Sequence, residues 1–467
     1  TVEMKVKDVA GNERVYTYEF TVDDEAPVIA AVTPAASAKL NAAGITTLDV
    51  TMSDPDLADG SSGTGVDTDT FIWSIGNADA SYTASGNNTE LSGSGPSYSV
   101  AIPSISISGV YTVEMKVKDV AGNERVYTYE FTVDDGAPVI AAVDPVEFDV
   151  LNAAELGAGI AKLDITMSDP ELNDTSAGTG VNTSTFIWSI VDAGTYADGG
   201  DHGDLTDNGS GSYSVAITPI TASGKYTVEM KVKDIAGNER VYTYEFTVDD
   251  EAPVIEAVTP GDGDQLDASG IGMVQLQITM TDPELNDHSD GTGVNTSTFT
   301  WSIENADASY TASGNNTELS GSGPSYSVAI PSISISGVYT VEMKVKDVAG
   351  NERVYTYEFT VDDEAPVIAA VTPAASAKLN AAGITTLDVT MSDPDLADGS
   401  SGTGVDTDTF IWSIGNADAS YTASGNNTEL SGSGPSYSVA IPSISISGVY
   451  TVEMKVKDVA GNERVYT

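Results

Sequence analysis

Oxygen-bearing side chains recur in short segments of this chain, and their types point to metal chemistry. The first set comprises an acidic linker, an Asp-rich loop and a turn: Asp23, Asp24, Glu25, Asp54, Asp56, Asp59, Asp67, Asp119 and Asn123. Six to eight hard oxygen ligands in a flexible arrangement favour Ca²⁺ over Mg²⁺. The chain has no cysteine and only two histidines, so metals that prefer sulfur or imidazole lack ligands. We therefore expect calcium as the cofactor.

The same set returns three more times along the chain. The second copy comprises Asp134, Asp135, Asp169, Glu171, Asp174, Asn182, Asp234 and Asn238. The third comprises Asp249, Asp250, Glu251, Asp282, Glu284, Asp287, Asn295, Asp347 and Asn351. The fourth comprises Asp362, Asp363, Glu364, Asp393, Asp395, Asp398, Asp406, Asp458 and Asn462. Asp and Asn interchange at one loop position, which suits an oxygen ligand better than a requirement for charge.

The copies belong to a tandem repeat. The string TVEMKVKD begins at residues 1, 112, 227, 340 and 451, so the spacing is 111–115 residues, the size of one small β-sandwich. We expect the C-terminal strands of a preceding repeat at 1–24, complete repeats at 25–135, 136–250 and 251–363, and a repeat lacking its last strand at 364–467. Residues 1–128 recur unchanged as 340–467. We expect the chain to be a window on a longer repetitive protein.

Alternating side chains predict the strands that must position these oxygens. Val113, Met115 and Val117 alternate with polar residues, which is the pattern of a half-buried strand. Other segments of each repeat show the same period, and helical patterning is essentially missing. Several short strands with turns between them predict an all-β, antiparallel sandwich. One tryptophan per repeat lies on the third expected strand: Trp73, Trp188, Trp301 and Trp412.

The run KVKDVAGNERVYTYEFTVDDEAPVI resembles the end of one bacterial or archaeal immunoglobulin-like repeat and the start of the next. The likeness lies in the Asp-x-Ala-Gly-Asn turn, the F-T-V-D strand and the Asp-x-x-Ala-Pro junction. The loop SDPDLADGSSGTGVDTDTF extends it, and it covers essentially the whole chain. The resemblance implies tandem immunoglobulin-like sandwiches in an elongated rod, as in the often calcium-dependent extender regions of surface adhesins and in filaments. The acidic junction also loosely resembles cadherin linkers.

A sandwich of this kind brings the linker, the loop between its second and third strands and the turn before its last strand to one end. Two like charges about 6 Å apart repel by roughly 0.7 kcal/mol in water, so a rim of carboxylates favours a bound cation. Two alternatives stay open. The loops can be solvated turns, since Asp, Asn, Gly and Ser are turn residues, or the acids can be an adaptation to salt. The spacing does not fit an EF-hand.

The composition of the chain excludes several classes of function and partner. The chain of 467 residues has 70 acidic and 19 basic side chains and a net charge of −51, which excludes nucleic acid as a partner. No apolar run is long enough to enter a membrane. Identical acid sets in every repeat suit a structural role, so we do not expect an enzyme. We expect a calcium-stiffened extracellular fibre or filament at the cell surface, whose partners are neighbouring copies of the chain or repeat. The alternative is an adhesin stalk or a module that binds cell-surface glycans, with roles in cell adhesion and biofilm.

Overall fold

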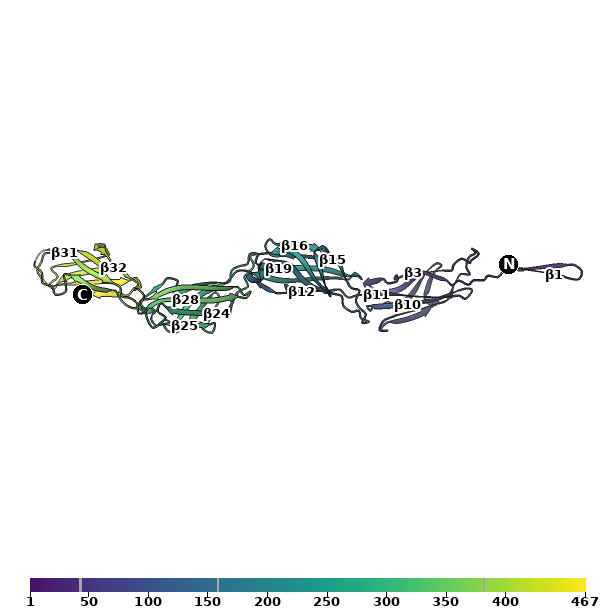
Figure 1. Cartoon of the computed structure of the whole chain (residues 1–467), viewed down its shortest axis with the longest axis horizontal. Coiled ribbons are helices and arrows are strands. Elements are labelled where there is room, and N and C mark those ends of the chain that lie inside the picture. The colour runs from purple at the N-terminus through teal and green to yellow at the C-terminus, as the bar shows by residue number, and fades with distance from the viewer. Residues whose placement is uncertain (42–43, 158, 381–382) are drawn as a thin grey trace. The chain divides into compact units, whose positions relative to one another are not determined.

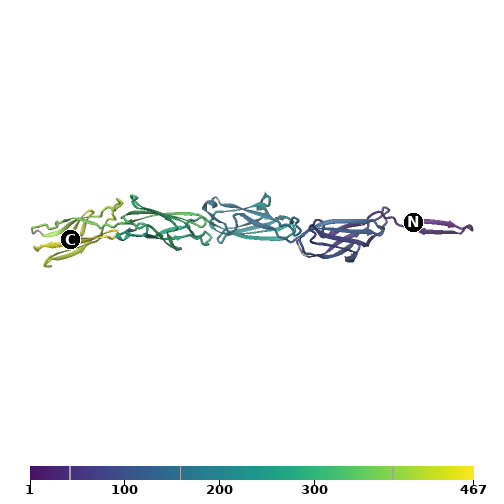
Figure 2. The same cartoon turned by 90° about the horizontal axis from the view of Figure 1, so that it is seen from below.

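The computed structural model describes residues 1–41, 44–157, 159–380 and 383–467. Strands hold 59% of the residues and helices 3%, which confirms the expected all-β class. Residue contacts divide the chain into two compact units. One comprises Thr1–Asp149, Ala158–Thr221 and Lys225–Phe246, and the other comprises Val150–Gly157, Ala222–Gly224 and Thr247–Thr467. Within each unit the strands form two-layered sandwiches (Figures 1 and 2). No helix in the described part of the chain is long and apolar enough to cross a membrane.

The first complete repeat has nine strands and one short helical turn. They are β3 (Val28–Thr33), β4 (Lys39–Asn41), β5 (Ile45–Ser53), β6 (Val66–Asn77), β7 (Thr83–Asn87), the 3-10 turn η1 (Asn88–Glu90), β8 (Leu91–Ser94), β9 (Ser97–Ile105), β10 (Gly109–Asp119) and β11 (Glu124–Asp134). One sheet has the order β3-β5-β9-β8 and the other β4-β11-β10-β6-β7. All neighbours are antiparallel except β4 and β11. An antiparallel pair, β1 (Val2–Lys7) and β2 (Glu13–Tyr18), precedes this repeat.

The other repeats follow the same plan. The second has β12 (Val139–Asp144), β13 (Val150–Asn152), α1 (Ala153–Leu156), β14 (Ile160–Ser168), β15 (Val181–Val191), β16 (Ala197–Asp201), η2 (His202–Asp204), β17 (Leu205–Gly209), β18 (Ser212–Ile220), β19 (Gly224–Asp234) and β20 (Glu239–Asp249). The third has β21 (Val254–Thr259), β22 (Gln265–Leu266), η3 (Ala268–Gly270), β23 (Gln275–Thr281), β24 (Val294–Asn305), β25 (Thr311–Asn315), β26 (Leu319–Ser322), β27 (Ser325–Ala329), β28 (Gly337–Asp347) and β29 (Glu352–Val361). The fourth has β30 (Val367–Thr372), β31 (Ile384–Ser392), β32 (Val405–Asn416), β33 (Thr422–Asn426), η4 (Asn427–Glu429), β34 (Leu430–Ser433), β35 (Ser436–Ile444), β36 (Tyr450–Asp458) and β37 (Glu463–Tyr466).

Alternating residues build the core between the two layers. In β10, Val113, Met115 and Val117 are at most 1% exposed, because successive side chains of a strand point to opposite faces. Met115 lies opposite Trp73 of β6, the expected third-strand tryptophan, which is 4% exposed. The core therefore closes by packing alone in a chain that has no cysteine.

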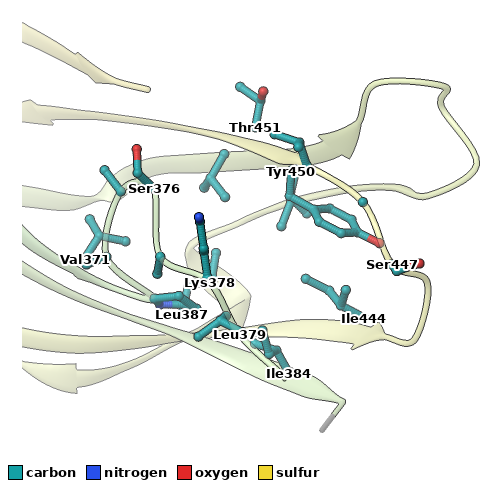
Figure 3. Close-up of a pocket in the computed structure, with 18 of the residues that line it drawn as sticks. Val371, Ser376, Lys378, Leu379, Ile384, Leu387, Ile444, Ser447, Tyr450 and Thr451 are labelled. Atoms are coloured by element: carbon teal, nitrogen blue, oxygen red, sulfur yellow. The ribbon is translucent and has the colours of Figure 1, made fainter. Parts of the chain in front are cut away.

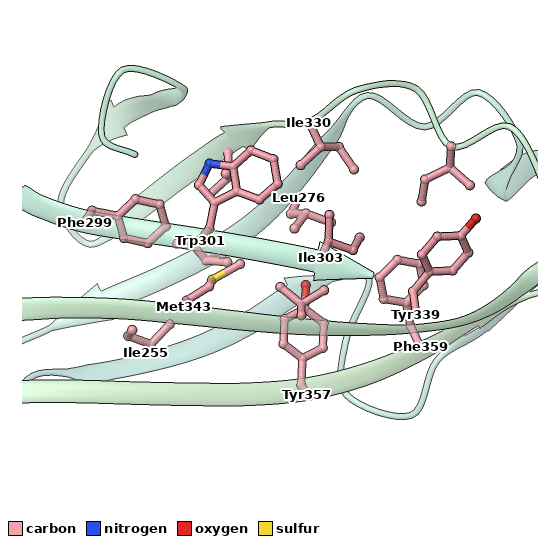
Figure 4. Packing of buried hydrophobic residues seen from close by; sticks show 14 of the residues in the cluster. Ile255, Leu276, Phe299, Trp301, Ile303, Ile330, Tyr339, Met343, Tyr357 and Phe359 are labelled. Atoms are coloured by element: carbon pink, nitrogen blue, oxygen red, sulfur yellow. The ribbon is translucent and has the colours of Figure 1, made fainter. Parts of the chain in front are cut away.

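Figure 4 shows the equivalent core of the third repeat. Trp301 and Met343 face the opposite layer, and the rings of Tyr339 and Phe359 stack with centroids 5.4 Å apart. The Tyr339 hydroxyl donates to the Ile335 carbonyl at 2.8 Å, so the buried phenol is satisfied. This core fixes the ends of the strands on which the acidic loops begin.

The fourth repeat has an open core where the others are covered. Leu387, Tyr450 and Val452 line a cavity of about 760 Å³, part of which Figure 3 shows. The equivalent residues of the first repeat are fully buried, and the strand β11 with Phe131 and Val133 completes that core. At that edge the fourth repeat has β37, which ends one residue before the end of the printed sequence.

Candidate metal centres

Three carboxylates meet at one end of each repeat, and we call each group a carboxylate trio. The trios are Asp23–Asp54–Asp119, Asp134–Asp169–Asp234, Asp249–Asp282–Asp347 and Asp362–Asp393–Asp458, and in each one carboxylate oxygens lie within 4.8 Å of one another. The first member stands at the end of one repeat or in the linker after it, and the other two belong to the next repeat. A trio thus joins two consecutive repeats through their side chains.

Backbone donors aim the carboxylates of a trio. In the fourth trio, the Thr403 amide and hydroxyl donate to Asp362 Oδ2 at 3.0 and 2.8 Å. The Gly404 amide donates to Asp393 Oδ2 at 2.7 Å. Asp458 Oδ1 accepts from the two amides at the end of its own turn, at 2.6 and 2.8 Å. The three side chains are therefore fixed before any ligand arrives, as a preorganised site requires.

One oxygen in every trio is buried and has no hydrogen-bond partner in the described part of the chain. It is Oδ1 of the middle member: Asp54, Asp169, Asp282 and Asp393. A buried polar atom without a partner costs free energy. The same oxygen lacks a partner in all four trios, and a bound cation would pair with it.

The electrostatics of the middle aspartates agree with this reading. Burial, reinforced by the charges of the two neighbouring carboxylates, raises the pKa of Asp282 and of Asp393 to about 6. Burial also raises the pKa of Asp54 and Asp169. In the first trio, hydrogen bonds from the Thr64 amide and hydroxyl lower the pKa of Asp23. A positive ion would relieve both the burial of charge and the mutual repulsion.

A glycine in the same loop leaves room for the trio. A Cβ added to Gly402 would lie 2.1 Å from the Pro394 carbonyl oxygen and 2.6 Å from Asp393 Oδ2. Gly63, Gly178 and Gly291 are equally confined. The loop therefore folds tightly over the middle aspartate and excludes side chains from it.

The donor set fits Ca²⁺, which takes carboxylate and carbonyl oxygens. The trio would hold the ion, with the partnerless Oδ1 as a ligand ready to bind. The bound ion would supply two positive charges, which offset most of the charge of the three carboxylates. The first aspartate of the trio would attach the preceding repeat to the ion. The second and third aspartates would attach the next repeat.

The structure places the other candidate ligands outside the trios. Asp24, Glu25, Asp56, Asp135, Glu171, Glu251, Glu284, Asp363, Glu364 and Asp395 are exposed. Asp250 is half-buried and has a partnerless Oδ1 of its own. These side chains border the trios without joining them.

The loop position at which Asp and Asn interchange lies at the start of the next strand and does not face the trio. Its residues are Asp67, Asn182, Asn295 and Asp406. Asn182 and Asn295 accept hydrogen bonds from the serine hydroxyls two residues later, both at 2.6 Å. Asp67 and Asp406 accept from the amides two residues later. This exchange of Asp and Asn, interpreted from sequence as a sign of a metal ligand, is explained by a turn that either residue can form.

The turn asparagines act as clips for the linker. Asn351 Nδ2 donates to the Asp249 carbonyl at 2.7 Å, to the Glu251 carbonyl and to Asp347 Oδ2. Asn123 and Asn238 make the same three bonds in their repeats. Asn462 donates to the Asp362 carbonyl and to Asp458 Oδ2. Their amide nitrogen, and not a free oxygen, faces the linker aspartate and the trio.

Asp59, Asp174, Asp287 and Asp398, at the third loop position, also lie outside the trios. Asp174 and Asp398 accept hydrogen bonds from the preceding repeat, at the other side of the loop. The loop acids were expected to converge on one rim that faces the preceding repeat; of the described acids of each loop, one aspartate joins the trio.

Sequence reasoning missed the residues that hold the trio in place. Thr64, Thr292 and Thr403 donate through amide and hydroxyl, and Thr179 through its amide, to the linker aspartate. A signal was available, because the letters G-T-G occur in this loop of all four repeats.

Comparison with known proteins agrees with the fold. Residues 1–137, 213–364 and 336–467 match the profile of the bacterial Ig-like domain (group 3), and residues 167–250 match another bacterial Ig-like domain profile. No curated protein matches the chain. A solved tetra-tandem repeat in the extending region of a large adhesion protein is 19% identical over 92% of this chain and 97% of its own, with a TM-score of 0.32. The protocadherin gammaB4 extracellular domain is 11% identical over 99% of this chain and 75% of its own, with a TM-score of 0.33. On the strength of the family profiles, this chain belongs to the bacterial Ig-like domain family and is a tandem array of its repeats.

Proposed function

We propose that the chain is a structural repeat region of an extracellular, cell-surface fibre or adhesin stalk, in which Ca²⁺ stiffens the junctions between repeats. The observation that carries the proposal is the composition of each trio. Its first carboxylate ends one repeat and its second and third belong to the next. An ion bound there ties two folded bodies together through the linker.

The mechanics follow from the attachment of each ligand. Asp134 is the last residue of β11, so the core strand of one repeat leads directly to the site. Asp234 is the last residue of β19, and Asp169 lies just after β14. Each ligand thus stands next to a paired strand, so a bound ion would restrain the linker against two sheets at once.

The near-identity of the repeats supports a mechanical role. Residues 305–340 repeat residues 77–112 unchanged, a span that includes β7 and β8 of the first repeat. A function that depends on length and stiffness needs many equal units, whereas a recognition site needs to be built once.

Thermal unfolding of the full chain tests the proposal. A ligand that binds only the folded state at 100 times its Kd adds about 2.7 kcal/mol of stability. Ca²⁺ should therefore raise the Tm by several degrees above the value in EDTA. Mg²⁺ at the same concentration should raise it less, because Mg²⁺ demands tighter octahedral geometry. Equal Tm values in Ca²⁺ and in EDTA would refute the calcium proposal.

A further inference from the structure

A second contact joins consecutive repeats away from the trio. It lies between one loop of a repeat, the latch loop (residues 172–176 in the second repeat and 396–400 in the fourth), and the end of the preceding repeat. In the fourth repeat Asp398 Oδ2 accepts from the Val338 amide at 2.9 Å and from the Ala306 amide at 3.3 Å. In return, the Ala397 amide donates to the Ser336 hydroxyl at 3.1 Å. We call the receiving residues the socket: Ala306, Ser336, Gly337 and Val338.

The same contact forms between the first and second repeats with a different loop sequence. Asp174 Oδ2 accepts from the Val110 amide at 2.8 Å and the Ala78 amide at 3.3 Å. The Asn173 amide donates to the Ser108 hydroxyl at 3.0 Å. The loop reads L-N-D-T-S here and L-A-D-G-S in the fourth repeat, and the bonds to the preceding repeat use the shared aspartate and the backbone amide of the variable residue before it.

The socket has room only for a glycine at its centre. A Cβ added to Gly337 would lie 2.4 Å from Asp398 Oδ2, and one added to Gly109 would lie 2.7 Å from Asp174 Oδ2. Neither glycine has a positive φ. The need for glycine here therefore comes from the approach of the carboxylate, and not from the backbone conformation.

Burial shows that the contact is made between repeats. Asp174 and Asp398 are 1% and 7% exposed, and the loop leucines Leu172 and Leu396 are 5% and 4% exposed. In the first repeat, which follows only the β1–β2 pair, the equivalent Asp59 is exposed.

The receiving side behaves in the same way. Ser108 and Ser336 are each 3% exposed, whereas Ser447 of the fourth repeat is exposed. Loop and socket are thus buried only where both partners are present.

The chemistry of this contact needs no cation. A buried carboxylate must be neutralised or hydrogen-bonded. Here two backbone amides of the preceding repeat, and the Ser400 amide of its own loop, donate to Asp398. Hydrogen bonds to a charged acceptor are about twice as strong as neutral ones. We propose that the latch loop and socket form a direct, cation-independent latch that restrains the second repeat against the first and the fourth repeat against the third.

Distance measurements between repeats test this proposal. The chain has no cysteine, so Ser322→Cys and Ser433→Cys, both at exposed strand ends, allow two spin labels to be attached to the full chain in the third and fourth repeats. In EDTA, we expect Asp398→Asn to widen the distribution of label distances at least about twofold, because the amide of Asn is a weaker acceptor than a carboxylate. Ser336→Ala, which removes one hydroxyl from the socket, should widen it less.

Asp395→Asn is the matched control. It removes one charge from the same loop, but Asp395 is exposed and makes no hydrogen bond to the described residues of the third repeat. Its distribution of label distances should equal that of the parent chain. The latch is refuted if, in EDTA, the distribution of label distances in Asp398→Asn is no wider than that of the parent chain. It is also refuted if Asp398→Asn lowers the number of Ca²⁺ bound, since Asp398 would then be a ligand. Because the distances are measured in EDTA, the result does not depend on the calcium proposal.

Discussion

Replacing the middle aspartate of every trio by asparagine should stabilise the protein in EDTA and destabilise it, relative to the parent chain, in Ca²⁺. The variant carries Asp54→Asn, Asp169→Asn, Asp282→Asn and Asp393→Asn, so that all repeats change together. Asparagine keeps a side-chain oxygen for the amide bond, such as that from Gly404 at 2.7 Å. Its NH₂ group then faces the other two carboxylates as a donor.

The magnitude follows from the geometry of the trio. Carboxylate oxygens within 4.8 Å of one another repel by at least about 0.9 kcal/mol per pair at the dielectric constant of water. A trio has three pairs, and the substitution removes two of them. Each repeat should therefore gain about 1.7 kcal/mol in EDTA. For a domain of this size that corresponds to a Tm rise of about 5–10 °C.

Scanning calorimetry in EDTA and in saturating Ca²⁺, at low ionic strength, measures the change in Tm that the substitutions cause in each buffer. The parent chain should gain stability from Ca²⁺, and the variant should gain little because the partnerless ligand oxygen is gone. The order of the two Tm values should thus invert between the two buffers. The control chain carries Asp56→Asn, Glu171→Gln, Glu284→Gln and Asp395→Asn, which removes the same charge from exposed positions in the same loops. If the variant is no more stable than this control in EDTA, the repulsion argument is wrong.

Two further predictions concern the same sites. In EDTA the Tm should fall as the pH rises from about 4 to about 6.5. The pKa of Asp282 and of Asp393 is raised to about 6, above the 3.8 of an ordinary aspartate, so between these values the folded state binds more protons than the unfolded state, and this stabilisation is lost as the pH rises through 6. The fourfold Asn variant should lose this part of the pH dependence, and a slope as steep as that of the parent chain would contradict the assignment. Gly402→Ala should destabilise the fourth repeat by about 2 kcal/mol or more through overpacking and should weaken its Ca²⁺ binding. Gly415→Ala, whose Cβ meets no atom closer than 3.6 Å, should do neither. Equal effects of the two substitutions in chemical denaturation would show that the loop adjusts to the added methyl group.

Much of the fold is readable from the sequence. The period-2 alternation of Val113, Met115 and Val117 predicts their burial, because strand side chains alternate between faces. The repeated tryptophan was expected on the third strand, and Trp73 lies in β6, which is the fourth strand because the short β4 precedes β5. These features follow from the order of residues within one strand, so they can be predicted without knowing which segments pack against that strand.

The site was harder to read, because the role of an aspartate in a loop depends on what surrounds it. Asp393 and Asp398 lie five residues apart in one loop, yet the first faces a trio and the second faces the preceding repeat. Turn propensity is the same for both. Only the path of the loop, set by the confined Gly402 and by the docked Leu396, separates the two roles.

The number of calcium ions bound per chain tests the central claim most directly. Isothermal titration of the full chain with Ca²⁺ should give four sites, one for each carboxylate trio, and none of these sites should remain in the fourfold Asn variant. Titration that shows no saturable binding, or the same stoichiometry in the parent chain and in the variant, would contradict the assignment of the trios as calcium sites.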